Sequence, residues 1–188
     1  YSEIPMERVK FFFQRIYRVS LSYPRQEVLV WQDLKKLHLQ ADWRHGIFER
    51  EKTLETTFEI NEGVNATFRY MIHGSFLHSR VRVLEDFPAE LATEFFILAT
   101  HFNNLLQSGV VIVDAHARNI EYSDKKELLV HLLYNGEIYN QITQHYNIST
   151  DLYSAFQRLL LEQESPAIII ADFLKSKERR NQDPPQPS

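Results

Sequence analysis

Cysteine is absent from the 188 residues of this chain, and glycine occurs only five times. The absence of cysteine excludes disulfides, thiolate metal sites and a cysteine nucleophile. The glycines are not clustered, so the sequence has no glycine-rich phosphate-binding loop, and it contains neither a GxSxG nor an HExxH motif. These absences argue against the enzyme classes that such motifs define, and no cofactor is predicted.

Long apolar runs and an excess of positive charge are also missing. No run approaches the ~20 apolar residues that span a bilayer, and the N-terminus does not resemble a signal peptide. The formal net charge of −4 gives no general attraction to nucleic acid or to an anionic membrane. We therefore expect a cytoplasmic protein without membrane contact, for which nucleic acid is an unfavoured partner.

The sequence contains enough apolar residues to form a hydrophobic core, since 44% of its residues are hydrophobic and 13% are aromatic. This composition argues against a disordered chain, and the length fits one domain. We predict a single α+β domain over residues 1–174, in which an N-terminal helical region, residues 1–50, packs on a core formed by residues 54–174. Residues 175–188 are charged and then proline-rich, which predicts a disordered tail.

The centre of this prediction is the stretch from Pro88 to Tyr134. Pro88 suits the first turn of a helix, and the apolar residues after it recur at helical spacing on one face. Gly109 fits the left-handed position that ends a helix. We therefore expect a core helix lying on a sheet, with Phe96 widening its apolar side. The residues of the stripe are Leu91, Phe95, Leu98, Phe102 and Leu105.

After Gly109 the apolar pattern changes to a period of two, which is typical of a strand. We predict a strand over residues 110–122, a polar turn at residues 123–126 and a second strand over residues 127–134. Together these segments predict a hairpin next to the core helix.

Upstream of the core helix, the pattern of residues 54–84 predicts three strands with short turns. This favours an antiparallel meander with one buried face and one solvent-exposed face. A helix is expected from Ser2 to Tyr23. Residues 26–40 fit either a strand or an amphipathic helix, and we favour the helix. Residues 41–52 are predicted to form a loop.

Downstream of the hairpin, residues 137–147 show no clean period. Ser149 or Thr150 is expected to cap a helix that begins there. Pro166 is expected to mark a break and a restart of helical structure.

The predicted order is α-β-β-β-α-β-β-α with an antiparallel sheet and an extra N-terminal segment. The stretches that contribute most to the resemblance described next are Phe95–Leu98, Asn103–Leu106, Gly109 and the strand ending Asn119–Tyr122. Over Leu54–Leu174 the chain resembles the type III secretion chaperone-like fold, and its length and mild charge favour the YbjN-like branch. The resemblance implies a small homodimer that binds unfolded or extended segments of partner proteins.

Aromatic residues exceed what one helix stripe buries, so we predict that some of them form a partner or dimer surface. An equally weighted alternative is that these rings cap the open side of the sheet. The predicted function is a non-catalytic protein-interaction module, chaperone-like or regulatory, that binds a partner segment through an apolar surface. The residues assigned to this surface are Phe11, Phe12, Tyr17, Trp31, Trp43 and Phe96.

A first alternative function is a metal-assisted or acid–base enzyme. In the predicted hairpin, Asp114 and His116 share a strand face with Arg118, and His131 lies on the next strand. Two histidines and an aspartate can bind a divalent metal. A solvated sheet face with cross-strand charge pairs explains the same pattern and is favoured, so no metal site is predicted.

A second alternative is a nucleic-acid binder that uses Arg80 and Arg82. These arginines alternate with apolar residues on a predicted strand, from which they would reach backbone phosphates. Glu59 and Glu85 lie nearby in the sequence, so a solvated strand face is the favoured interpretation.

Overall fold

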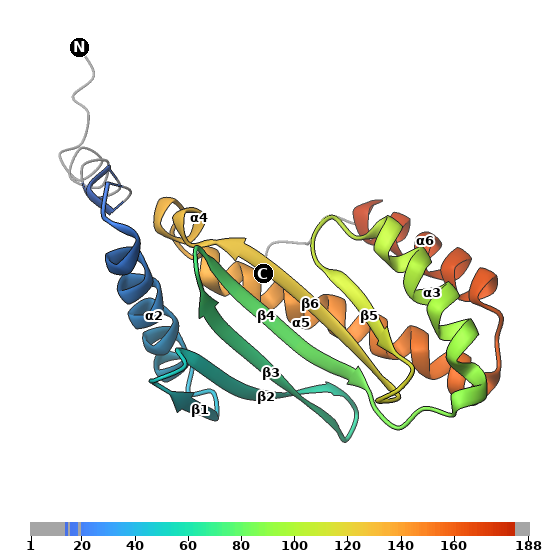
Figure 1. The fold of residues 1–188 in the computed structure, drawn as a ribbon. Coiled ribbons are helices and arrows are strands. Elements are labelled where there is room, and N and C mark those ends of the chain that lie inside the picture. Colours follow the sequence, from blue (N-terminus) through green and yellow to red (C-terminus); the bar gives the residue numbers. More distant parts are fainter. Residues whose placement is uncertain (1–13, 15, 19, 183–188) are drawn as a thin grey trace, which may run out of the picture. The chain divides into compact units, whose positions relative to one another are not determined.

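The computed structural model of the chain describes residues 14, 16–18 and 20–182. It is a mixed structure of helices and one six-stranded antiparallel sheet, which confirms the predicted α+β class (Figure 1). Most of the helix predicted over residues 2–23 lies outside the described residues, as do Phe11 and Phe12.

The chain divides into two compact units, and each is described here by itself. The expectation of a single domain stays a prediction. Unit 1 comprises the described residues within 1–58, 67–79 and 124–145. Unit 2 comprises the described residues within 59–66, 80–123 and 146–188.

The strands follow the order β1-β2-β3-β4-β6-β5 in the sheet. The three strands predicted in residues 54–84 are confirmed as β2, β3 and β4. The loop predicted over residues 41–52 is wrong in part, because β1 lies within it and pairs antiparallel with β2. The bounds are His45–Phe48 for β1, Thr53–Asn61 for β2, Val64–His73 for β3, Phe76–Leu84 for β4, Val110–Asp114 for β5 and Asn119–Glu127 for β6.

The predicted hairpin exists, but its turn lies earlier than expected. Asp114 ends β5 because its Oδ1 accepts hydrogen bonds from the backbone N–H groups of His116 and Ala117 at 2.9 and 2.8 Å. This side-chain-to-backbone bonding is a local turn motif. Arg118 then takes a left-handed conformation with a φ of 51°, and β6 begins at the next residue.

As a result, residues 123–126 belong to strand β6 instead of a turn. The second strand predicted over residues 127–134 is also wrong, since helix α4, Leu128–Leu133, occupies most of that range.

The helical interpretation of residues 26–40 is confirmed by α2, Tyr23–Gln40, which has Pro24 in its first turn. After strand β4, a short 3₁₀ turn, η1 (Ala89–Leu91), leads into α3, Ala92–Leu105.

The C-terminal helices differ from the prediction at both ends. Helix α5, Glu137–Gln157, runs through Ser149, which is fully buried inside the helix and does not cap it. A π-helical turn, η2 (Arg158–Glu162), follows α5. Helix α6, Pro166–Gln182, starts at the expected proline but continues past residue 174, so the first part of the predicted disordered tail is helical.

The core of Unit 2 is built on the predicted face of α3. Phe95, Leu98 and Phe102 are fully buried. The Phe102 ring lies 5.0 Å from that of Phe173 on α6 and 6.1 Å from that of Phe156 on α5, measured between ring centroids. Helix α3 is therefore a core element, as its spacing predicts.

The prediction that Gly109 ends the helix is wrong, because α3 ends at Leu105 with Leu106 as its C-cap, although Gly109 does have the expected positive φ, +74°. Gly109 precedes β5 instead, and a Cβ placed there would lie 2.6 Å from the Tyr122 ring and 2.8 Å from the Ser123 carbonyl oxygen. We expect Gly109→Ala to lower the free energy of unfolding by about 2 kcal/mol, from backbone strain plus this overlap. Gly74→Ala is the matched control, because Gly74 has a φ of +56° and no atom within 4 Å of its added Cβ. Urea unfolding of both variants checks the prediction, and equal losses would contradict the role of the overlap.

Candidate functional site

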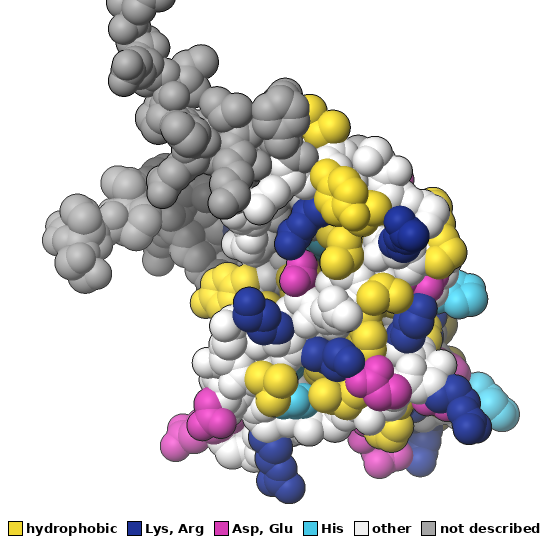
Figure 2. All heavy atoms as spheres, turned by 90° about the vertical axis from the view of Figure 1, so that its left-hand side faces the viewer, with side chains coloured by type: hydrophobic (Ala, Val, Ile, Leu, Met, Phe, Trp, Pro, Cys, Tyr) yellow, Lys and Arg dark blue, Asp and Glu magenta, His cyan; other side chains and the backbone are white. Residues whose placement is uncertain are grey.

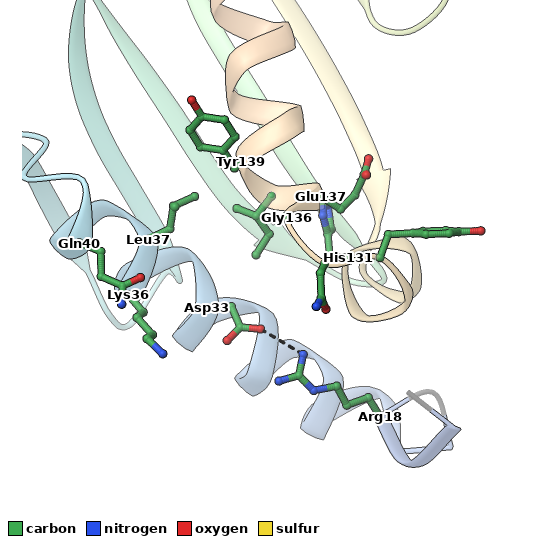
Figure 3. A pocket seen from close by; sticks show the side chains of 12 residues that line it. Arg18, Asp33, Lys36, Leu37, Gln40, His131, Gly136, Glu137 and Tyr139 are labelled. Carbon is green, nitrogen blue, oxygen red and sulfur yellow. Dashed lines mark ion pairs between the residues drawn. The ribbon is translucent and has the colours of Figure 1, made fainter. Parts of the chain in front are cut away.

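Unit 1 contains an open pocket of about 220 Å³ lined by α2, α4 and the start of α5 (Figure 3). We call it the α2–α5 pocket. The residues that line it are Arg18, Asp33, Lys36, Leu37, Gln40, His131, Tyr134, Asn135, Gly136, Glu137, Ile138 and Tyr139.

One wall of the pocket is the first turn of α5. Gly136 has a φ of +78°, so the chain turns sharply there before the helix starts. The backbone N–H of Glu137 bonds to the Tyr134 carbonyl at 3.3 Å, and the N–H of Asn140 bonds to the Gly136 carbonyl at 2.9 Å. The Asn135-Gly136 turn therefore positions the N-terminus of α5 at the pocket.

Four charged side chains line the pocket, and the two carboxylates among them are held in ion pairs. Asp33 pairs with Arg18 at 3.7 Å, and Glu137 pairs with Lys126 at 2.5 Å. Lys36 is exposed at the pocket wall and has no counter-ion among the described residues. The residues that line the pocket therefore carry balanced charge, with Arg18 and Lys36 against Asp33 and Glu137.

His131 is the most buried titratable group of the pocket, with only 6% of its surface exposed. Neither ring nitrogen makes a hydrogen bond of normal length among the described residues, but the Gln141 side chain lies close enough to accept from the single N–H of the neutral ring. Burial lowers the pKa of His131 to about 4, helped by the positive charge of Lys126, while Glu137 and the nearby Gln141 side chain act in the opposite direction. The ring is therefore neutral at physiological pH.

Beside the pocket, α2 buries a cluster of aromatic and imidazole rings. His38 is fully buried, its Nδ1 lies 2.9 Å from the Leu34 carbonyl oxygen, and burial lowers its pKa. The His38 ring lies 5.2 Å from that of Trp43, 5.7 Å from that of His45 and 5.8 Å from that of Tyr70. Burial raises the pKa of Tyr70, so its hydroxyl stays protonated. The sequence does not predict this cluster, because Tyr70 lies on β3, distant in the chain from the other three rings, and the segment that contains Trp43 and His45 is predicted to form a loop.

The aromatic residues assigned to a partner surface are placed differently from one another. Tyr17 is 63% exposed and Phe96 is 47% exposed, as a surface role requires. Trp31 is buried and its Nε1 donates a hydrogen bond to Glu49 at 2.7 Å, so its assignment to an exposed surface is wrong. Trp43 is half-buried and its ring meets that of Phe58 at 5.1 Å.

The strand face proposed for a metal or acid–base site is not formed. Asp114 is the last residue of β5 and His116 lies in the turn after it, both in Unit 2, whereas His131 lies on helix α4 of Unit 1. Within the residues that the structure describes, no group of three or more histidine, aspartate or glutamate side chains is arranged to hold a metal ion. Asp114 instead orders the turn.

The arginines proposed for phosphate recognition are each paired with a carboxylate. Arg80 lies 3.8 Å from Glu121, and Arg82 lies 3.2 Å from Glu85. These pairs agree with the solvated strand face that the sequence favours.

Comparisons with known proteins give no relative for this chain. No protein-family model matches it, and searches of curated proteins and of solved structures find no match. The resemblance to the YbjN-like branch therefore stays a prediction. Among the described helices, none is long and apolar enough to cross a membrane.

Proposed function

We propose that this chain is a non-catalytic protein-interaction module that binds an extended segment of a partner protein by strand addition at β1. The observation that carries the proposal is the exposure of this edge strand. β1 lies at one end of the strand order, and its Ile47 and Phe48 side chains are 37% and 48% exposed. Figure 2 shows the side of the molecule on which α2 and β1 lie in Figure 1. Hydrophobic side chains on this side are interspersed with charged ones.

The opposite end of the strand order, β5, is closed by a side chain. The Asn103 amide accepts a hydrogen bond from the Val111 N–H at 2.7 Å and donates one to the Val111 carbonyl at 2.9 Å. Asn103 thereby occupies backbone groups that an added strand would use. No hydrogen bond of this kind covers β1 among the described residues, so β1 is the more accessible edge.

Strand addition suits these features physically. The backbone groups of an edge strand supply affinity for an extended peptide, and side chains that alternate across the sheet supply specificity. Ile47 and Phe48 are consecutive, so they point to opposite faces and contact a bound segment on both sides. Apolar extended segments are therefore the expected ligands.

The test is selection of linear peptides from a random library, followed by measurement of their affinity by fluorescence polarisation. We expect Phe48→Lys to weaken binding at least tenfold, because it removes an apolar anchor and places charge at the edge. Ile112→Lys on the closed edge β5, where Ile112 is 45% exposed, is the matched control and should change affinity by less than about threefold.

Methylating alternate backbone nitrogens of a selected peptide tests the pairing itself, since it removes donors without changing side chains. Equal binding of the methylated and unmethylated peptides, or equal effects of the two lysine substitutions, would contradict strand addition at β1.

The expected homodimer has the same physical basis, because β1 of a second copy offers a complementary antiparallel edge. Light scattering over a range of protein concentrations measures the assembly. If β1 forms the contact, Phe48→Lys shifts the dimer towards monomer and Ile112→Lys does not.

A further inference from the structure

Partly exposed aromatic rings lie at the α2–α5 pocket. Tyr139, in the first turn of α5, lines the pocket and has 49% of its surface exposed. The half-buried Trp43 ring lies next to it, with 6.4 Å between the ring centroids and 18° between the ring planes. The Trp43 ring is held in turn by an edge-on contact with the Phe58 ring at 5.1 Å. Two nearly parallel rings therefore form a fixed aromatic surface beside the pocket.

The rest of the lining combines apolar surface with hydrogen-bond donors. The half-buried Leu37 side chain points from α2 towards α5 in Figure 3, and the Tyr134 ring, which is 56% exposed, also lines the pocket. The amides of Gln40 and Asn135 and the hydroxyl of Tyr139 are groups that can donate hydrogen bonds to a ligand. The pocket therefore suits a ligand that is apolar and carries acceptors.

The charges of the lining do not select a charged ligand. Arg18 and Lys36 balance Asp33 and Glu137, and both carboxylates are held in ion pairs. A proline-rich segment in the polyproline II conformation meets the remaining requirements, because its rings are compact and apolar and its carbonyls make no internal hydrogen bonds. Its conformation is largely formed before binding, which lowers the entropy lost, and aromatic-lined grooves bind such segments.

The chain itself carries a segment of this kind. Three of its seven prolines fall within residues 184–187. A polyproline II helix has three residues per turn, so Pro184 and Pro187 lie on the same edge of such a helix, about 9 Å apart. The segment follows α6 and lies outside the described residues. Its sequence is Asp183-Pro184-Pro185-Gln186-Pro187-Ser188.

We propose that the α2–α5 pocket and Trp43 bind a proline-rich segment in the polyproline II conformation, and that residues 183–188 of this chain are the occupant. A proline ring packs on the Tyr139 and Trp43 rings, and the neighbouring carbonyls accept hydrogen bonds from the donors of the pocket. This site does not depend on strand addition at β1, because proline lacks the N–H group that an added strand uses.

The test measures the binding of a fluorescently labelled peptide with the sequence of residues 181–188 by fluorescence polarisation. The protein is the full chain with the substitutions Pro184→Ala, Pro185→Ala and Pro187→Ala, so that its own segment does not compete. We expect saturable binding of this peptide. A peptide with the same three prolines replaced by alanine should bind at least about tenfold more weakly. No saturable binding, or equal binding of the two peptides, would overturn the proposal.

The unsubstituted full chain tests whether residues 183–188 are the occupant. Its own segment competes with the added peptide by mass action, so its apparent affinity should be lower than that of the substituted chain by at least about twofold. Equal apparent affinities of the two chains would overturn the assignment of this segment as the occupant.

A pair of equally exposed tyrosines locates the site. Tyr139→Ala should weaken peptide binding at least about tenfold, because it removes the exposed ring of the pocket. Tyr23→Ala is the matched control, since Tyr23 is also 49% exposed but does not line the pocket, and it should leave the affinity within about twofold. Equal effects of the two substitutions would overturn the proposed location.

Phe48→Lys separates this site from strand addition at β1. It should leave the affinity for the proline-rich peptide within about twofold, because Phe48 does not line the pocket. The same substitution weakens the binding of peptides selected for β1. Equal losses with both kinds of peptide would overturn a separate site in the α2–α5 pocket.

Discussion

Phe102→Ala is expected to lower the free energy of unfolding by about 3–5 kcal/mol. The Phe102 side chain is fully buried in Unit 2. It contacts the rings of Phe156 and Phe173, so the substitution leaves a cavity where three helices meet. The loss includes both the transfer free energy of the ring and the cavity term.

Urea unfolding followed by circular dichroism measures this effect. Phe96→Ala is the matched control, because Phe96 lies on the same helix with 47% of its surface exposed. It should change the free energy of unfolding by less than about 1 kcal/mol. Similar losses for the two variants would show that α3 does not present the Phe102 face to the core.

Where the apolar period is clean, the sequence predicts the structure well. In β3, Phe68, Tyr70 and Ile72 are buried, whereas Thr67 and Arg69 on the other face are exposed and Met71 there is half-buried. The same holds for the stripe of α3. In both cases one face is buried against the rest of its unit, so hydrophobic burial alone sets which residues turn inward.

The hairpin turn was misplaced because alternation continues past the end of the strand. Val111 and Val113 are buried in β5, and Ala115 and Ala117 extend the same period without belonging to it. The strand ends at Asp114 because the side chain of Asp114 accepts hydrogen bonds from the backbone of the turn. A hydropathy pattern contains no information about such hydrogen bonds. The apolar run of α4 is short enough to fit a strand or a helix equally.

The second half of helix α5 is predicted, but its first half is not, because several of its buried positions are polar. Gln141, His145 and Ser149 recur every four residues and are at most 1% exposed. Gln141 is held there by its hydrogen bonds to Ser79 and Leu77. Buried polar residues with partners cancel the hydrophobic period of a helix, so the first half of α5 showed no pattern.

The candidate site could not be predicted from the sequence, because its lining comes from segments that are separate in the chain. Residues of α2, α4 and the start of α5 line the pocket, whereas the sequence predicts a strand over the segment that forms α4. His131 was noted as a possible metal ligand on a strand, whereas its position on α4 buries it beside Gln141. Only the tertiary structure brings Lys36 and His131 into one pocket.

Acid is expected to destabilise the protein through His131. Its pKa is about 4 in the folded chain and 6.5 when unfolded, so the neutral ring contributes its full stability above pH 6.5. As the pH falls from 6.5 to 4, the unfolded state binds a proton that the folded state does not. The difference corresponds to about 3 kcal/mol of unfolding free energy lost over this window. His38, whose pKa is also lowered by burial, acts in the same direction.

Urea unfolding at a series of pH values checks this expectation. His131→Gln removes the titrating group and should flatten the loss between pH 6.5 and 4 by most of that amount. His116→Gln is the control, because His116 is exposed in the turn after β5 and its replacement should leave the pH dependence unchanged. An unchanged pH profile in His131→Gln would show that the buried imidazole is not the group that senses acid, since the charged ring would then be tolerated at a position that is only 6% exposed.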